Sequence, residues 1–216
     1  MILSDNGRIS GTTSNALTVA NVLPTDAGDY RLIVTNSSGA ATSAVATLTI
    51  TLPEFVVIPD AALESSVRAA LNKPTGPLTP ADLGTLTGLS ACGQSISNLA
   101  GLEWATNLVS LNVSFNAISN VTGVEGLSRL IQLGLDGNRI NDLSPLAGLT
   151  NLNSLNLGGN FITNVSALSG LTNLTALSLH RNPLGSLNPL TNLAGLKSLV
   201  LFSAGIADSS DRKSVV

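Results

Sequence analysis

The amino-acid sequence predicts an α/β repeat solenoid with short parallel strands on its concave face, preceded by an all-β segment. Two observations predict this: an apolar pattern that repeats every 22 residues from position 89, and alternating apolar and polar residues before position 52. The three apolar columns are Leu89, Leu111, Leu133, Leu155, Leu177 and Leu199; Val113, Leu135, Leu157, Leu179 and Leu201; and Ile118, Ile140, Ile162, Leu184 and Ile206. One coil of such a solenoid cannot bury its own apolar edge, so only the stack has a core.

Composition excludes several classes of protein. The 216 residues are 44% apolar and only 11% charged, with a net charge of −3. Without a basic patch, binding to nucleic acid is not expected, and without a run of about 18 apolar residues, neither is membrane insertion. Residues 1–8 have no signal-peptide pattern. The single cysteine, Cys92, excludes an internal disulfide framework and a cysteine-based metal cluster, and we expect no metal or cofactor.

Residues 1–52 are expected to form one domain or part of one. Alternation predicts strands over 15–22, 30–35 and 44–50. Composition predicts a turn over 24–28, a hairpin connection over 36–39 and a stiff linker over 52–54.

Asp26-Ala-Gly-Asp-Tyr30, followed by Val34-Thr-Asn-Ser-Ser-Gly39 and a final alternating strand, resembles the C-terminal half of an immunoglobulin-like domain. The resemblance implies that Tyr30 forms the corner before the sixth strand of that fold. Leu32 stands where the family has a cysteine, so the inter-sheet disulfide is not expected. The resemblance also implies that the chain begins inside a domain.

Residues 53–88 are expected to hold the linker and a helical cap for the array. A helix over 59–72 has Asp60 as its N-cap and an apolar face of Leu63, Val67, Ala70 and Leu71. A second helix begins after Thr79, with Pro80 at its first position and Asp82 placed to return a bond to the cap residue.

Repeats are expected over 89–207, followed by an uncapped tail over 208–216. In each repeat a short strand, such as Leu155–Leu157, precedes an asparagine whose amide can bond buried backbone groups. The expected ladder is Asn116, Asn138, Asn160 and Asn182, and Ala204 occupies the next position.

The recurring pattern Leu-x-x-Leu-x-Leu-x-x-Asn-x-Ile, with its helical lead-in over 59–206, resembles bacterial leucine-rich repeat proteins of the internalin-like class. The resemblance implies a secreted or cell-surface protein of bacterial origin.

Catalysis is difficult to build from these residues. His180 and Cys92 are the only histidine and cysteine, and they lie four repeats apart, or about 19 Å at ~4.8 Å per strand. Outward positions of the concave face are mostly small, and five residues differ from that background. These candidate ligand contacts are Phe115, Asp136, His180, Arg181 and Phe202. The alternative is that these five residues are ordinary surface variation. Two other large residues, Arg139 and Phe161, follow the ladder asparagines and lie on the turn.

The resulting hypothesis is a non-enzymatic protein- or glycan-binding module of a larger bacterial protein. Two alternatives stay open: a passive stalk in a large adhesin, and a domain that positions an enzyme encoded outside this chain. Five Asn-x-Ser/Thr triplets are interpreted as structural, beginning at Asn36, Asn112, Asn120, Asn164 and Asn173.

Overall fold

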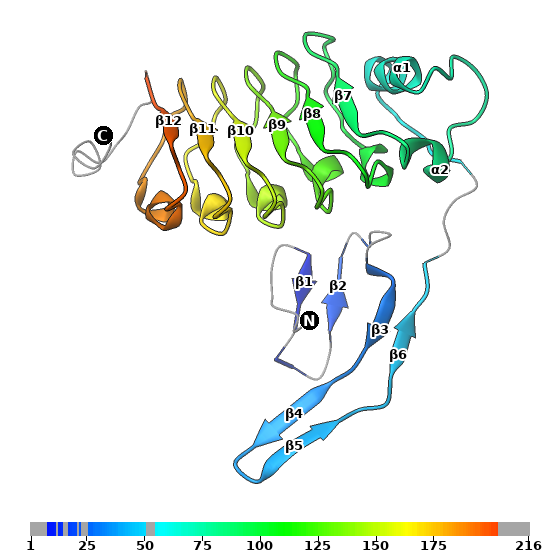
Figure 1. Ribbon diagram of the computed structural model, residues 1–216, viewed down its shortest axis with the longest axis vertical. Helices are drawn as coiled ribbons and strands as arrows, with labels where there is room; N and C mark the ends of the chain where they lie inside the picture. The colour runs from blue at the N-terminus through cyan, green and yellow to red at the C-terminus, as the bar shows by residue number, and fades with distance from the viewer. Residues whose placement is uncertain are drawn as a thin grey trace. The chain divides into compact units, whose positions relative to one another are not determined.

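A computed structural model describes residues 8–11, 13–14, 17–20, 22, 26–50 and 55–202 (Figure 1). The chain divides into two compact units, Met1–Pro53 and Glu54–Val216. Several expectations lie wholly or partly outside the described residues: part of the strand over 15–22, part of the turn over 24–28, the linker over 52–54, the end of the repeats at 207 and the tail over 208–216.

Among its described residues, the first unit contains three antiparallel strand pairs. Strand β1 (Ile9–Ser10) pairs with β2 (Thr18–Val19), β3 (Gly28–Tyr30) with β6 (Ala46–Leu48), and β4 (Ile33–Asn36) with β5 (Gly39–Thr42). Asn36 pairs with Gly39 across the expected hairpin. The single strand predicted over 30–35 is wrong, because Leu32 bonds to Ser43 through its amide and its carbonyl, and this separates β3 from β4.

Two helices open the second unit. Helix α1 (Ala61–Ala70) starts at Asp60, whose side chain accepts hydrogen bonds from the amides of Ala62 and Leu63. The other carboxylate oxygen of Asp60 accepts from the amides of Ser97 and Asn98. Asp60 therefore ties the start of α1 to the first repeat.

Helix α2 (Pro80–Leu83) begins with the capping box that the sequence predicts. The Thr79 hydroxyl accepts from the Asp82 amide, and the Asp82 carboxylate accepts from the Thr79 amide. Lys73 Nζ lies 2.6 Å from the same carboxylate oxygen. Hydrogen bonds from Lys73 and Thr79 lower the pKa of Asp82 to about 2.

Asp60 has a lowered pKa for a related reason. Burial raises the pKa of its carboxyl group, but the hydrogen bonds from the amides of Ser97, Leu63 and Asn98 and from the Ser97 hydroxyl outweigh that effect. The charged form of Asp60 is therefore favoured by the fold.

Six parallel strands form one sheet in chain order. They are β7 (Gly88–Ser90), β8 (Ser110–Asn112), β9 (Gln132–Gly134), β10 (Ser154–Asn156), β11 (Ala176–Ser178) and β12 (Ser198–Val200). Leu89 pairs with Leu111, and the same register continues along the sheet, so the predicted 22-residue step is the strand-to-strand step. The coils that begin at β7 through β12 are numbered 1 to 6.

Short 3₁₀ helices return the chain opposite the strands (Figure 1). They are η2 (Leu102–Trp104), η3 (Thr122–Val124), η4 (Ser144–Leu146), η5 (Ser166–Leu168) and η6 (Asn188–Asn192). At the starts of η3 and η5, the side-chain oxygens of Asn120 and Asn164 each accept a hydrogen bond from the backbone amide two residues later. Asn36 and Asn112 make the same local bond, so these four Asn-x-Ser/Thr triplets have a structural use.

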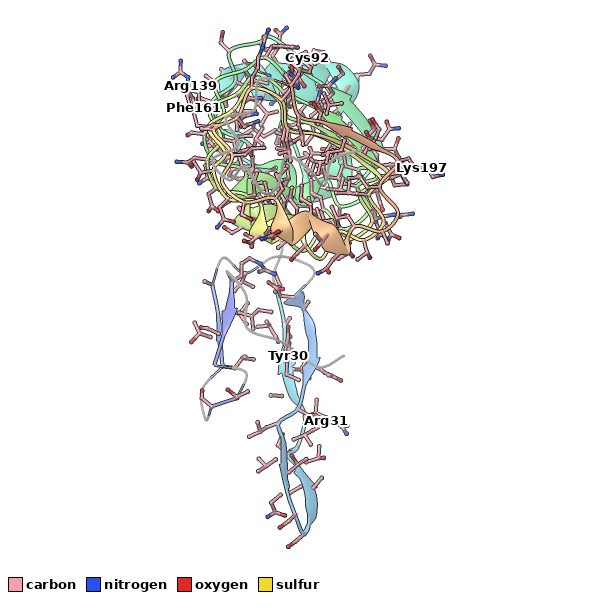
Figure 2. All side chains as sticks on the ribbon, turned by 90° about the vertical axis from the view of Figure 1, so that its left-hand side faces the viewer. Tyr30, Arg31, Cys92, Arg139, Phe161 and Lys197 are labelled. Atoms are coloured by element: carbon pink, nitrogen blue, oxygen red, sulfur yellow. The ribbon has the colours of Figure 1, made fainter. Side chains whose placement is uncertain are left out.

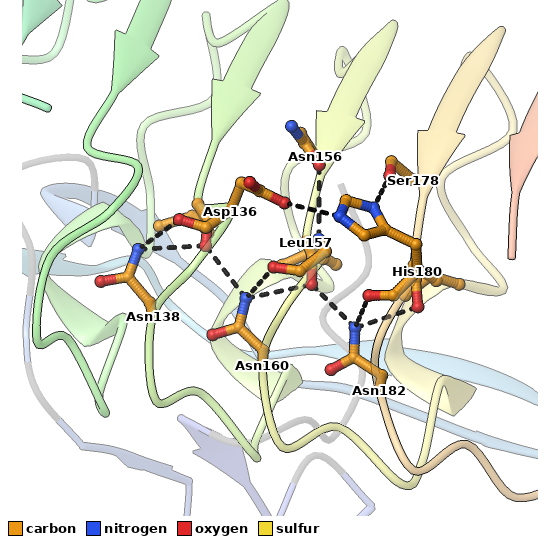
Figure 3. Close-up of polar contacts among 11 residues, drawn as sticks. Asp136, Asn138, Asn156, Leu157, Asn160, Ser178, His180 and Asn182 are labelled. Carbon is orange, nitrogen blue, oxygen red and sulfur yellow. Dashed lines mark hydrogen bonds and ion pairs between the residues drawn. The ribbon is translucent and has the colours of Figure 1, made fainter. Parts of the chain in front are cut away.

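One apolar core runs through the second unit, from Leu63 and Val67 of α1 along the leucine columns of the coils. Beside it lies the asparagine ladder, whose members Asn138, Asn160 and Asn182 are at most 6% exposed. Asn160 Nδ2 lies 3.0 Å from the carbonyl oxygens of Leu135 and Leu157, and its Oδ1 accepts from the Ile140 amide at 2.9 Å. Each asparagine thus satisfies buried backbone groups of its own coil and of the preceding coil (Figure 3).

Candidate binding surface

The strand face comprises the outward side chains of β7–β12 and of the positions two residues beyond each strand. Most outward positions within the strands are Ser, Asn, Gly or Ala. The column beyond the strands is more varied, and from coil 1 to coil 6 it contains Cys92, Ser114, Asp136, Gly158, His180 and Phe202. The chemistry of the strand face is therefore concentrated in one column.

His180 is the centre of a side-chain network in this column (Figure 3). Its Nδ1 lies 2.8 Å from the Ser178 hydroxyl, and its Nε2 lies 3.5 Å from Asp136 Oδ1. Its ring stacks on Phe202, with ring centroids 4.6 Å apart and 20° between the ring planes. Three of the five candidate residues, Asp136, His180 and Phe202, are thus brought together across coils 3 to 6.

Gly158 makes the contact between His180 and Asp136 possible. These two residues lie two coils apart, and Gly158 occupies the same column in the coil between them. A Cβ atom at position 158 would lie 2.0 Å from His180 Cε1 and 2.4 Å from Asp136 Oδ1. The absent side chain leaves the space through which the two groups meet.

The network is largely removed from solvent. The side chains of Asp136 and His180 are 13% and 17% exposed. Asp136 Oδ1 is buried and accepts no hydrogen bond, so the imidazole is the polar group that faces it. The two form an ion pair when the imidazole is protonated, and a buried carboxylate without such a partner is unfavourable.

Phe115 and Arg181 do not lie on strands, contrary to the expectation that they are outward positions of the concave strand face. Strand β11 ends at Ser178, and Phe115 and Arg181 have φ angles of 58° and 52°. In coils 1, 3 and 4 the same column carries glycine in the left-handed conformation, at Gly93, Gly137 and Gly159. The backbone turns here, and this places Phe115 and Arg181 at the border of the strand face.

Ser178, His180 and Asp136 have the composition of a hydrolytic triad. Such a site also needs free amide donors for a developing oxyanion. The amides on either side of His180, those of Leu179 and Arg181, donate to the carbonyls of Val200 and Phe202. Those two amides are therefore engaged with the next coil, and the contacts with Ser178 and Asp136 fix the orientation of the His180 ring. Within the described residues, no three His, Cys, Asp or Glu side chains gather as metal ligands.

Sequence reasoning missed Ser178 and Gly158 as members of this site. The signal was present in the repeat register, because Asp136, Gly158 and His180 are successive members of one column and Ser178 precedes His180 by two residues.

Comparison with known proteins agrees with the repeat geometry. The family described as leucine-rich repeats (2 copies) matches residues 128–170 and 150–198. Internalin C2 from Listeria monocytogenes is 34% identical with a TM-score of 0.57, and the alignment covers 77% of this chain and 85% of internalin C2. The chain belongs to the internalin family of leucine-rich repeat proteins. A second internalin from the same organism is 29% identical, with a TM-score of 0.59, and the alignment covers 73% of this chain.

This internalin-family chain spans 53% of the second internalin's length. A search of curated proteins gives no match. In the part of the chain that the structure describes, no helix has the length and apolar character needed to span a bilayer.

Proposed function

We propose that this chain is a non-enzymatic binding module of a larger bacterial secreted or cell-surface protein, and that its strand face contacts a protein or glycan partner. The observation that carries the proposal is the Asp136–His180–Phe202 network. Membership of the internalin family supports the class of protein.

The network is not part of the apolar core. Its side chains lie on the outward side of the sheet, and Phe202 is 58% exposed. Burying a carboxylate beside an imidazole costs free energy of desolvation. A surface without a binding role needs neither this arrangement nor the glycine in the intervening coil that permits it. A fixed imidazole bordered by an aromatic ring is instead a typical anchor for recognition, because rigid groups lose little conformational entropy on binding.

The proposed contacts are Asp136, His180 and Phe202 on the strand face. The other two candidates, Phe115 and Arg181, lie at its border and are not part of this network. For the first unit we propose an immunoglobulin-like spacer. The hydrogen bond of 2.6 Å from the Tyr30 hydroxyl to the Asp26 carbonyl supports this, since such a tyrosine corner is characteristic of that fold.

Matched variants test the strand-face proposal. The chain with Asp136→Ala, His180→Ala and Phe202→Ala should lose affinity for any native partner at least ten-fold, about 1.4 kcal/mol. The control carries Ser128→Ala, Thr150→Ala and Thr172→Ala, which are exposed positions away from the strands. Capture of surface extracts by immobilised wild-type, variant and control chains gives the comparison.

A passive stalk is the main alternative, and the small outward residues of the strands favour it. It predicts that the three chains capture the same material in equal amounts. Equal capture would therefore reject the binding proposal and leave the stalk.

A further inference from the structure

Four exposed side chains, one in each of coils 2 to 5, lie where the chain leaves the strand face. They are Phe115, Arg139, Phe161 and Arg181, and together they are called the rim. Arg139 and Phe161 occupy the same column in adjacent coils, and the Phe161 amide donates to the carbonyl of Ile140, the residue after Arg139. Figure 2 shows both side chains at the edge of the second unit, pointing away from it.

Two rim residues hold a backbone conformation that suits glycine. Phe115 and Arg181 have φ angles of 58° and 52°, whereas Gly93, Gly137 and Gly159 fill the equivalent positions of coils 1, 3 and 4. A left-handed conformation is unfavourable for residues with a Cβ atom. Phe115 and Arg181 therefore carry a conformational free-energy cost that the glycines of the same column do not, and we look for a contribution of their side chains that offsets it.

Burial in the apolar core does not offset this cost. Phe115 is 66% exposed and Phe161 is 60% exposed. Arg139 and Arg181 are exposed, and within the described residues neither guanidinium forms an ion pair. The Phe115 ring does lie over Gly137, where a Cβ atom would come within 2.6 Å of it, so the ring has a defined place on the surface.

We propose that the rim is a second contact surface, distinct from the strand-face network, and that it binds a short extended acidic polypeptide segment with apolar side chains. The rim is cationic in a chain of net charge −3, which favours an acidic partner. Arginine and aromatic residues are also the types enriched at protein–protein contacts.

Geometry limits the segment and its mode of binding. Coils 2 and 5 are three strand steps apart, about 14 Å at ~4.8 Å per step, which matches about four extended residues. The amides of Gly137 and Gly159 already donate to the carbonyls of Gly158 and His180. Recognition therefore depends on the Phe and Arg side chains rather than on an added strand.

The test uses the full chain and a fluorescein-labelled peptide of Glu, Gly and Phe, with binding followed by fluorescence anisotropy. Phe115→Gly with Arg181→Gly should weaken binding at least ten-fold. The same double variant should leave the melting temperature unchanged or raise it, because relief of the left-handed backbone offsets the greater freedom of glycine in the unfolded chain. A purely structural role for the two side chains would instead lower the melting temperature.

Control variants and probes separate the explanations. Ser119→Ala with Thr163→Ala changes exposed residues on the same turns and should leave peptide binding intact. The strand-face triple variant should also retain binding, so failure of the strand-face proposal does not affect this one. The proposal is overturned if the labelled peptide does not bind, if its lysine counterpart binds equally well, or if heparin binds the rim while the acidic peptide does not.

Discussion

Two glycines show how differently a single methyl group would act in this fold. At Gly158 an added Cβ would meet the ends of the His180 and Asp136 side chains, which can move away. At Gly123 it would lie 2.3 Å from the Leu99 carbonyl oxygen, which belongs to the backbone of the preceding coil. We expect Gly158→Ala to cost about 1 kcal/mol or less and Gly123→Ala about 1–3 kcal/mol or more.

Urea unfolding measures both effects, and the ring signals of His180 in NMR spectra report on the local one. Gly158→Ala should shift those signals because His180 leaves Asp136. Equal losses of stability in the two variants would show that the backbone clash at Gly123 is relieved in some other way.

The ladder asparagines should be far more important for stability than asparagines at the exposed turns. Asn160→Ala removes the side-chain partners of the Ile140 amide and the Leu135 carbonyl. Each buried group left unpaired costs about 1–3 kcal/mol. Asn120→Ala, which removes one exposed bond to the Thr122 amide, should cost about 1 kcal/mol or less. Thermal unfolding of the two variants gives the comparison, and similar melting temperatures would contradict this ranking.

At this scale, spacing predicts some contacts and not others. The Asn160 bonds follow from the sequence because the ladder asparagine recurs in coils 2 to 5 and its partners are backbone groups. The meeting of His180 with Asp136 does not recur. It depends on the empty position at Gly158, which the repeat register does place between Asp136 and His180, and on one choice of side-chain rotamer, which has no signal in the spacing.

Among the elements, α1 and α2 should make the free energy of unfolding depend on pH in the acidic range. The pKa of Asp60 lies below its ordinary value of 3.8, and that of Asp82 is about 2. A group whose pKa is lowered by folding stabilises the fold above its ordinary pKa, and this contribution is lost as the pH falls through the folded-state value. We therefore expect stability to decrease between about pH 4 and pH 2.

Urea midpoints measured across that range test the expectation. Asp60→Asn keeps a helix-capping side chain, but its amide nitrogen cannot accept from the Ser97 and Asn98 amides, so the variant should be less stable and less sensitive to acid. Asp142→Asn, at an exposed turn, serves as the control. An acid dependence that is the same in Asp60→Asn and in the wild type would exclude Asp60 as its source.

How well the sequence predicts each element depends on whether local or distant interactions form it. The start of α1 at Asp60 and the capping box at Thr79 and Asp82 follow from local side-chain bonds, and the sequence predicts them. The 3₁₀ helices are three to five residues long, which is too short to show an apolar period. The division between β3 and β4 depends on Ser43, which lies 11 residues from its partner Leu32, beyond the range of local propensity.

For the molecule as a whole, the two units are expected to unfold independently. In the first unit, Leu32, Ile33 and Val34 are all more than 50% exposed, so its described strands bury little apolar surface, and isolated strand pairs are marginally stable. Removing residues 1–53 should leave the calorimetric transition of residues 54–216 at the same temperature. A lowered transition temperature would show that the first unit stabilises the second.

The asparagine ladder also gives the stack a direction. Asn160 of coil 4 serves the Ile140 amide and the Leu135 carbonyl of coil 3, and Asn182 of coil 5 likewise serves coil 4. Coils 3 and 4 therefore have this buried amide satisfied only once the following coil exists. On the ribosome the chain emerges from its N-terminal end, so each new repeat completes the one already outside the exit tunnel. We therefore expect the repeats to assemble in the order of their synthesis, with one unfinished coil at the end of the nascent array.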